Sequence, residues 1–204
     1  MVRQIPDSRV VKIVVGLCLL SLASAARAHT EGIAAGGFFA GVMHPVSGLD
    51  HVLAMVAVGI WGAALGRPLL WALPVTFPLL MVGGGVLGIA GIPLPFVEHG
   101  IAASVVVLGL AILAAWRAPV PVALVVVGFF GVLHGYAHGL ELPESAAPAE
   151  YAAGFVISTG LLHLTGIALG ALHMLPKGRE LLRVAGAAIA AAGVWILFGM
   201  SGVI

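Results

Sequence analysis

The chain has 204 residues, of which 61% are hydrophobic and 8% are charged, and its mean hydropathy is +1.18. A soluble domain carries about 25% charged residues, so this composition cannot cover a water-facing surface and indicates an integral membrane protein. The net charge of +1 provides no basic surface for nucleic acid. Because the sequence also lacks a long polar stretch for a soluble catalytic domain, we expect a protein that is not an enzyme.

The first 28 residues have the pattern of a secretory signal peptide. Basic residues reach to Lys12, an apolar run continues to Leu22, and Ala26-Arg27-Ala28 is a cleavage site of the A-x-A type. This pattern predicts a signal peptide over 1–28 and a membrane domain over 29–204. The alternative is an uncleaved first helix, but an apolar run of about ten to twelve residues is too short to span a bilayer.

Six apolar segments follow, and each is long enough for the roughly 20 residues of a transmembrane helix. They lie near 34–64, 69–91, 95–116, 119–140, 151–174 and 181–203. The first is too long for one straight helix, and Pro45 and Gly48 within it predict a break. The expected fold is all-α, an integral membrane bundle of six transmembrane helices after a cleavable signal peptide, with the first span broken near Pro45–Gly48.

The charges in the connections predict an orientation, because Lys and Arg are enriched in cytoplasmic loops. Alternate connections are basic and carry Arg67, Arg117, Lys177, Arg179 and Arg183. The connections between them are acidic and carry Glu98, Glu141, Glu144 and Glu150. With an external amino terminus, six spans predict a protein of the bacterial inner membrane with both mature termini in the periplasm.

Small residues recur at a spacing of four, as at Gly131, Gly135 and Gly139, which indicates close helix packing. The run 83–88 also fits the GxGxxG pattern of nucleotide-binding loops, but it lies inside an apolar span, so we interpret it as packing.

Residues 37–44 resemble residues 128–134. Because these two spans run in opposite senses, the similarity suits an inverted repeat of three plus three helices, the alternative being coincidence in a glycine-rich chain.

Ionisable residues cluster in the first and fourth spans, although each costs about 2.5–3.5 kcal/mol to insert into a bilayer. His134 and His138 are four apart and share a helix face, and His44 and His51 are separated by almost two turns. The only cysteine, Cys18, lies in the signal peptide, so a metal would need imidazole, carboxylate or carbonyl ligands. Imidazoles with a carboxylate suit Ni²⁺, Co²⁺, Zn²⁺ or Cu²⁺.

We therefore predict a transition-metal site between the two spans. Its residues are His44, Asp50, His51, His134 and His138, with Glu141 near the outer end as an attracting or transient ligand. The alternative for the histidines is burial with hydrogen bonds to backbone or to each other. Asp50 could instead orient an imidazole without touching the ion.

The remaining histidines support weaker hypotheses. His99 follows Glu98, and the two residues form either an attracting vestibule or a solvated loop pair. His163 is either a further ligand or a polar contact between helices. His173 is expected to reach the membrane interface. His29 would be the new amino terminus, either an external chelating group or part of a disordered end.

Two segments of the chain resemble a known family. His44-x5-Asp50-His51 and the run His134-Gly135-Tyr136-Ala137-His138-Gly139-Leu140-Glu141 are similar to motifs of the HupE/UreJ family of nickel and cobalt permeases, which usually has Phe where this chain has Leu133. The resemblance implies secondary uptake of Ni²⁺ or Co²⁺ for hydrogenase, urease or cobalamin pathways. The ion is then a transported substrate, the lipid bilayer is the other partner, no resident cofactor is expected, and the oligomeric state is not implied.

A second interpretation is a b-type cytochrome or another membrane redox subunit, with histidines from two helices ligating haem. Asp50 beside His51 argues against it, because haem-ligating pairs usually lack an adjacent carboxylate.

Overall fold

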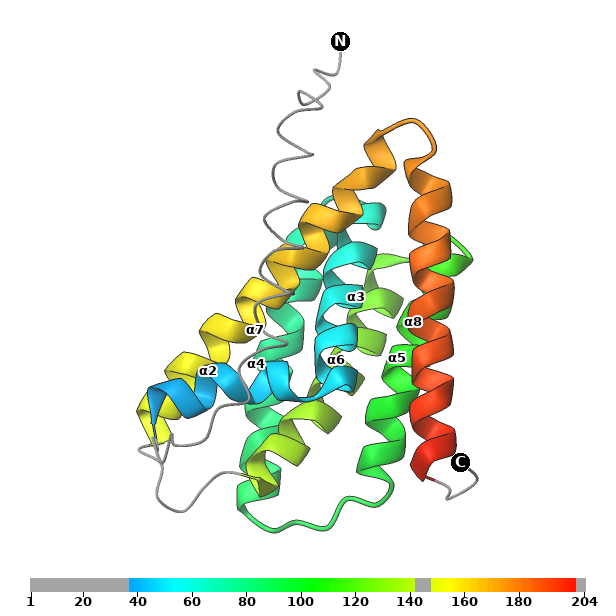
Figure 1. The fold of residues 1–204 in the computed structure, drawn as a ribbon. Helices are drawn as coiled ribbons and strands as arrows, with labels where there is room; N and C mark the ends of the chain where they lie inside the picture. The colour runs from blue at the N-terminus through cyan, green and yellow to red at the C-terminus, as the bar shows by residue number, and fades with distance from the viewer. Residues whose placement is uncertain (1–36, 142–147, 201–204) are drawn as a thin grey trace.

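The structure is a computed structural model that describes residues 37–141 and 148–200. Every regular element in these ranges is helical, as the sequence predicts (Figure 1). The elements are α2 (Phe38–Ser47), α3 (Leu49–Leu65), α4 (Leu69–Ile89), α5 (Val97–Leu113), α6 (Val120–Leu140), α7 (Pro148–Gly170), the 3₁₀ helix η1 (Ala171–Met174) and α8 (Gly178–Met200). The predicted signal peptide, His29 and Glu144 lie outside the described residues.

Within the described residues, four helical segments are long and apolar enough to cross a membrane: Leu69–Ile89, Val120–Leu140, Ala149–Met174 and Gly178–Met200. Helices α2 and α3 meet the same test only as a bent pair, which would make a fifth span. The segment predicted near 95–116 forms α5, an apolar helix of 17 residues that is shorter than the others. The chain is therefore a multi-pass helical bundle with four or five candidate spans, and the sixth span stays a prediction.

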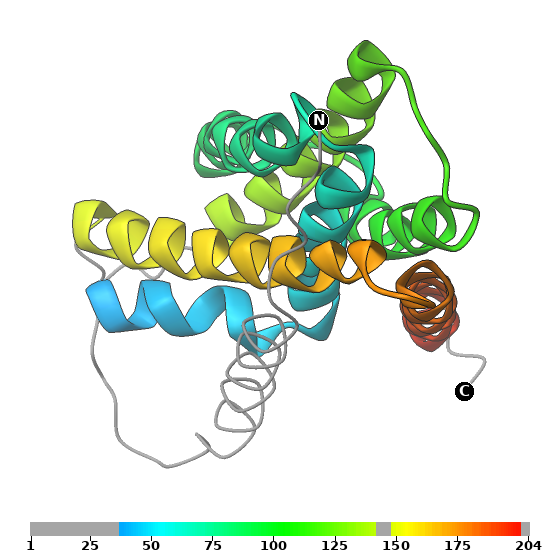
Figure 2. The same ribbon diagram turned by 90° about the horizontal axis from the view of Figure 1, so that it is seen from above.

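The break in the first segment falls at Gly48, whose backbone is extended with φ −98° and ψ 121°. Pro45 lies inside α2, which continues to Ser47, where the side-chain hydroxyl donates to the His44 carbonyl oxygen at 2.7 Å. The two helices meet at an angle of 84°. Helix α2 consequently runs beside the first half of α7, and α3 packs against its second half (Figure 2).

Glycines form the contacts between paired helices. A Cβ added to Gly84 of α4 would overlap the Val132 carbonyl oxygen of α6, and one added to Gly135 of α6 would overlap the Met81 carbonyl oxygen of α4. Similar close approaches occur at Gly41 and Gly154 between α2 and α7, at Gly59 and Gly166 between α3 and α7, and at Gly109 and Gly186 between α5 and α8. The interpretation of the run 83–88 as packing is confirmed for Gly84 and Gly88, where an added Cβ would overlap carbonyl oxygens of α6, whereas Gly83 has open space around it.

The helices associate as three main groups: α2 and α3 with α7, α4 with α6, and α5 with α8. The first half of the chain contains the α2–α3 pair, α4 and α5, and the second half contains α6, α7 and α8. If each helix is replaced by its counterpart in the other half, the contact of α2 and α3 with α7 becomes the contact of α6 with α4, and the α5–α8 contact stays the same. This is the pairing that an inverted repeat requires. The similar segments differ locally, because one ends at the break after α2 and the other lies within the unbroken α6.

The charged connections separate to opposite ends of the bundle (Figure 1). The α3–α4, α5–α6 and α7–α8 connections, which contain Arg67, Arg117 and Lys177, lie at the upper end in this view. Glu98 at the start of α5 and Glu141 after α6 lie at the lower end. The lower end is thus the acidic one, and the break between α2 and α3 is nearer to it.

Candidate metal site

The imidazoles predicted as ligands form one cluster where α2 and α3 meet α6. The His138 ring lies 4.7 Å from that of His44 and 4.5 Å from that of His51, measured between ring centroids. The rings of His51 and His134 are 5.0 Å apart. The break at Gly48 lets His44 at the end of α2 and His51 at the start of α3 reach the same place.

Asp50 holds the imidazole that follows it in the chain. Its Oδ1 lies 2.7 Å from Nδ1 of His51 and accepts the His51 backbone N–H at 2.8 Å. A carboxylate only accepts hydrogen bonds, so Nδ1 is the donor in this pair, and Nε2 is the ring nitrogen left to bind a metal ion. That Nε2 atom is buried without a hydrogen-bond partner. This is the carboxylate–imidazole arrangement that orients metal-ligating histidines.

His134 is fixed in the same way by its own helix. Its Nδ1 donates to the Phe130 carbonyl oxygen at 2.9 Å, which leaves Nε2 as the free acceptor, buried and without a partner. His138, which is 7% exposed, has no partner at either ring nitrogen. Three neighbouring imidazoles thus present unpaired nitrogen atoms, which is the state that divalent transition metals bind.

Glu141 completes the cluster at its outer edge. Its Oε2 lies 3.1 Å from Nε2 of His44. One ligand atom from each of His44, His138 and Glu141 lies within 4.8 Å of the others. Ligand atoms bind Zn²⁺-like ions at about 2.0–2.2 Å, so an ion held by all three residues would draw these atoms somewhat closer together. The Glu141 side chain is 58% exposed, which suits a first contact with an arriving cation.

A pocket of about 230 Å³ opens onto this cluster. Its lining residues are His44, Ser47, Gly48, Asp50, His51, Glu98, His138 and Glu141. The site residues predicted from sequence are therefore brought together, with His134 in contact behind His51. Glu98 was treated in the sequence only as a loop or vestibule residue, yet it lines the pocket from the first turn of α5. His99 does not, since its exposed ring packs on Phe96 at 6.1 Å.

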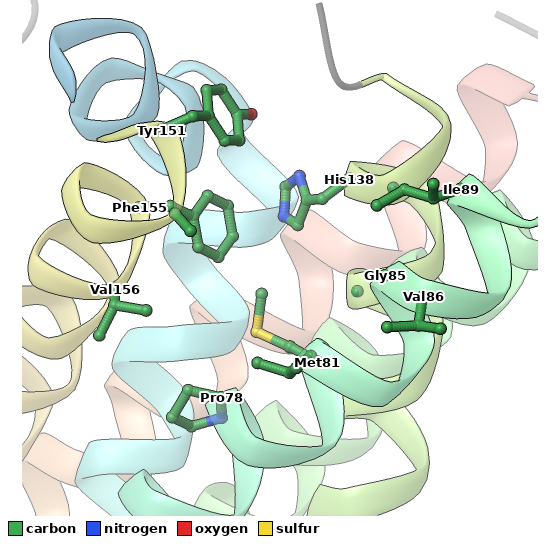
Figure 3. A pocket seen from close by; sticks show the side chains of 13 residues that line it. Pro78, Met81, Gly85, Val86, Ile89, His138, Tyr151, Phe155 and Val156 are labelled. Carbon is green, nitrogen blue, oxygen red and sulfur yellow. The ribbon is translucent and has the colours of Figure 1, made fainter. Parts of the chain in front are cut away.

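An apolar pocket of about 280 Å³ lies on the other side of His138, between α4, α6 and α7 (Figure 3). Figure 3 shows His138 facing Phe155 of α7, with Met81 of α4 beside them. The rings of His138 and Phe155 are 4.6 Å apart. His138 thus separates a polar pocket from an apolar one, and the apolar side chains keep its imidazole out of bulk water.

The two histidines of the fifth predicted span have different environments. His163 of α7 is 2% exposed; its ring interacts with the backbone of Thr159, one turn earlier, and leaves a buried ring nitrogen without a hydrogen-bond partner. His173 lies in η1, at the basic end of the bundle, where Nδ1 donates to the Gly170 carbonyl oxygen at 2.7 Å. His173 therefore has a local structural role away from the cluster.

Fold and site together define a multi-pass helical membrane protein with a buried histidine and carboxylate centre. Residues 17–196 match the model of a family described as HupE / UreJ protein. The chain belongs to the HupE/UreJ family. It is 48% identical over 188 residues to Protein HupE of Rhizobium leguminosarum bv. viciae, a match that covers 92% of this chain and 98% of that relative. No solved structure matches the chain.

Proposed function

We propose that this chain is a permease that imports a divalent transition-metal ion, Ni²⁺ or Co²⁺, to supply a metalloenzyme such as a hydrogenase or a urease. The observation that carries the proposal is the cluster of His51, His134 and His138 beside a polar pocket, because the His51 ring contacts the other two and all three keep buried ring nitrogens without partners. Membership of the HupE/UreJ family supports the same function.

The ion would reach the cluster from the acidic end. Glu98 and Glu141 on the pocket wall attract a cation and offer oxygen ligands while it still holds water. The imidazoles then replace water molecules of the hydration shell. Conduction needs binding that is favourable yet reversible. The ion would therefore meet the exposed carboxylates first and the buried imidazoles next, and it would not be enclosed completely at either place.

We further propose that the acidic end faces the periplasm of a bacterial inner membrane and that both mature termini lie there. The support is the separation of basic and acidic connections to opposite ends. In this orientation the inside-negative membrane potential favours inward movement of a divalent cation, by about 2.3 kcal/mol per charge per 100 mV.

The haem alternative fits the cluster poorly. The imidazoles of His44 and His51 both contact that of His138, with ring centroids 4.7 Å and 4.5 Å apart. A bis-histidine haem needs the porphyrin between its two axial rings, and these ring-to-ring contacts leave no room for one. Asp50 on His51 and the small polar pocket are instead features of a site for a bare ion.

Radiolabelled Ni²⁺ and Co²⁺ uptake into proteoliposomes containing the purified chain tests the function. The wild-type chain should accumulate either ion, and His138→Ala should accumulate almost none because the ring that joins both halves of the cluster is lost. His173→Ala is the matched control, since that ring bonds only to its own turn. Equal uptake by the wild type, His138→Ala and empty vesicles would refute the proposal, and a haem absorption band in the purified chain would favour the alternative.

A further inference from the structure

Buried polar atoms without partners extend beyond the metal site. In residues 37–141 and 148–200, the buried side-chain nitrogen and oxygen atoms that lack a hydrogen bond belong to His51, His134, His138, Tyr151, Thr159 and His163. An unsatisfied buried group costs about 1–3 kcal/mol, and native proteins rarely keep one without a reason. Three of these residues belong to the cluster described above. The other three all lie on α7.

The three residues of α7 share one face of that helix. Tyr151, Phe155, Thr159 and His163 are spaced by four, so each side chain lies beside the next, in a line that turns by about 40° around the helix at each step. The line starts at the metal site, because the Tyr151 ring lies 5.8 Å from that of His44 and the Phe155 ring 4.6 Å from that of His138. At about 1.5 Å per residue, it then continues roughly 18 Å along α7 to His163.

The inner end of this line is enclosed by protein. Thr159 is 0% exposed and His163 is 2% exposed. The Phe77 ring of α4 lies 5.2 Å from the His134 ring and 5.5 Å from the His163 ring, so one phenyl ring stands between the outer cluster and His163. Behind His163, α3 approaches so closely that a Cβ on Gly59 would overlap the His163 carbonyl oxygen.

We propose that His163 and Thr159 form a second, inner station for the transported divalent ion, beyond Phe77 on the way to the basic end. The proposal rests on the proposed function. One imidazole and one hydroxyl are a weaker ligand set than the outer cluster, as a release station requires, because an ion must leave the last site before the cytoplasm quickly. The unpaired atoms of both side chains are then satisfied by the partly hydrated ion as it passes.

Concentration-dependent initial rates of radiolabelled Ni²⁺ uptake into proteoliposomes test the station. The variants are Thr159→Val, which removes the hydroxyl and keeps the shape, and His163→Gln, which keeps a polar side chain but removes the imidazole. Leu162→Ala is the control for packing, because Leu162 is a buried neighbour on α7. All variants are compared at equal amounts of monodisperse protein.

We expect Thr159→Val and His163→Gln to lower the maximal rate by about tenfold or more while the half-saturating Ni²⁺ concentration is unchanged, since the outer cluster is intact. Leu162→Ala should keep the wild-type rate. Wild-type rates in both Thr159→Val and His163→Gln, while His44→Ala is inactive, would overturn the inner station alone. An equal loss in Leu162→Ala would also overturn it, because packing would then explain the effect. Absence of uptake by the wild type would refute the function and the station together.

Discussion

The carboxylate of Asp50 and the imidazole of His51 form one unit, with 2.7 Å between Oδ1 and Nδ1, although the two residues are adjacent in the chain. Neighbouring side chains on a helix normally diverge by about 100°. The contact exists here because both residues lie in the first turn of α3, where Asp50 also accepts the His51 backbone N–H. The two side chains therefore act on the site together.

Asp50→Asn should reduce Ni²⁺ uptake by about 10–100-fold, the usual cost of losing a residue that orients a ligand. The amide keeps an oxygen that can accept from Nδ1 of His51 but removes the negative charge. His51→Ala should abolish uptake, because it removes the imidazole itself. Initial uptake rates at equal membrane abundance check the ranking. If Asp50→Asn is as inactive as His51→Ala, Asp50 binds the ion or compensates its charge directly.

Glu98→Gln and Glu141→Gln should each raise the Ni²⁺ concentration for half-maximal uptake and reduce the maximal rate less. Both carboxylates line the outer pocket, so their charges act on capture of the ion rather than on its passage through the imidazoles. Glu150→Gln is the matched control, because Glu150 is an exposed acid of the same end that does not line the pocket. The effect should weaken at high salt, since exposed charges are screened; salt-independent defects would contradict an electrostatic role.

Gly84→Ala should destabilise the bundle by about 1–3 kcal/mol and weaken uptake. Its new methyl group would meet the Val132 carbonyl oxygen and push α6, with His134 and His138, away from α4. Gly83→Ala, one residue earlier, has open space around the added Cβ and should be neutral or stabilising by up to about 1 kcal/mol. Thermal unfolding of the two variants in the same detergent compares them directly. Equal unfolding temperatures would show that α4 and α6 can move apart at Gly84 without loss of stability.

Reporter fusions should place Pro68 and Pro148 on opposite sides of the membrane. Pro68 follows the basic Arg67 in the α3–α4 connection, and Pro148 begins α7 at the acidic end. Basic connections are retained in the cytoplasm, so a fusion at Pro68 should be active only with a cytoplasmic reporter. Activity on the same side at both positions would exclude the orientation proposed here.

Part of this arrangement follows from sequence alone. The four-residue spacing of His134 and His138 predicts a shared helix face, and Pro45 with Gly48 predicts a break in the first segment. The break occurs at Gly48, but its 84° angle depends on how α2 packs along α7 through Gly41 and Gly154. Local sequence contains no information about that tertiary contact, so the angle could not be predicted.

The role of Glu98 on the pocket wall was missed for the same reason. Its sequence neighbourhood shows only an acidic residue at the start of an apolar segment. The position of α5 beside the α2–α3 break brings Glu98 to the pocket. For His163 the sequence leaves two interpretations open, because it cannot show that this ring keeps a buried nitrogen without a partner.

The glycine contacts between helices also group five of the helices into two blocks. One block contains α2, α3 and α7, with His44, His51 and His163, and the other contains α4 and α6, with His134 and His138. Backbone-to-backbone contact holds the helices of each block close together, and the blocks also meet at Gly62 of α3, where an added Cβ would lie 3.0 Å from the Leu69 carbonyl oxygen of α4. The rings of His51 and His138, one from each block, lie 4.5 Å apart across this boundary. An ion held by His51 and His138, as proposed above, would therefore link the two blocks directly.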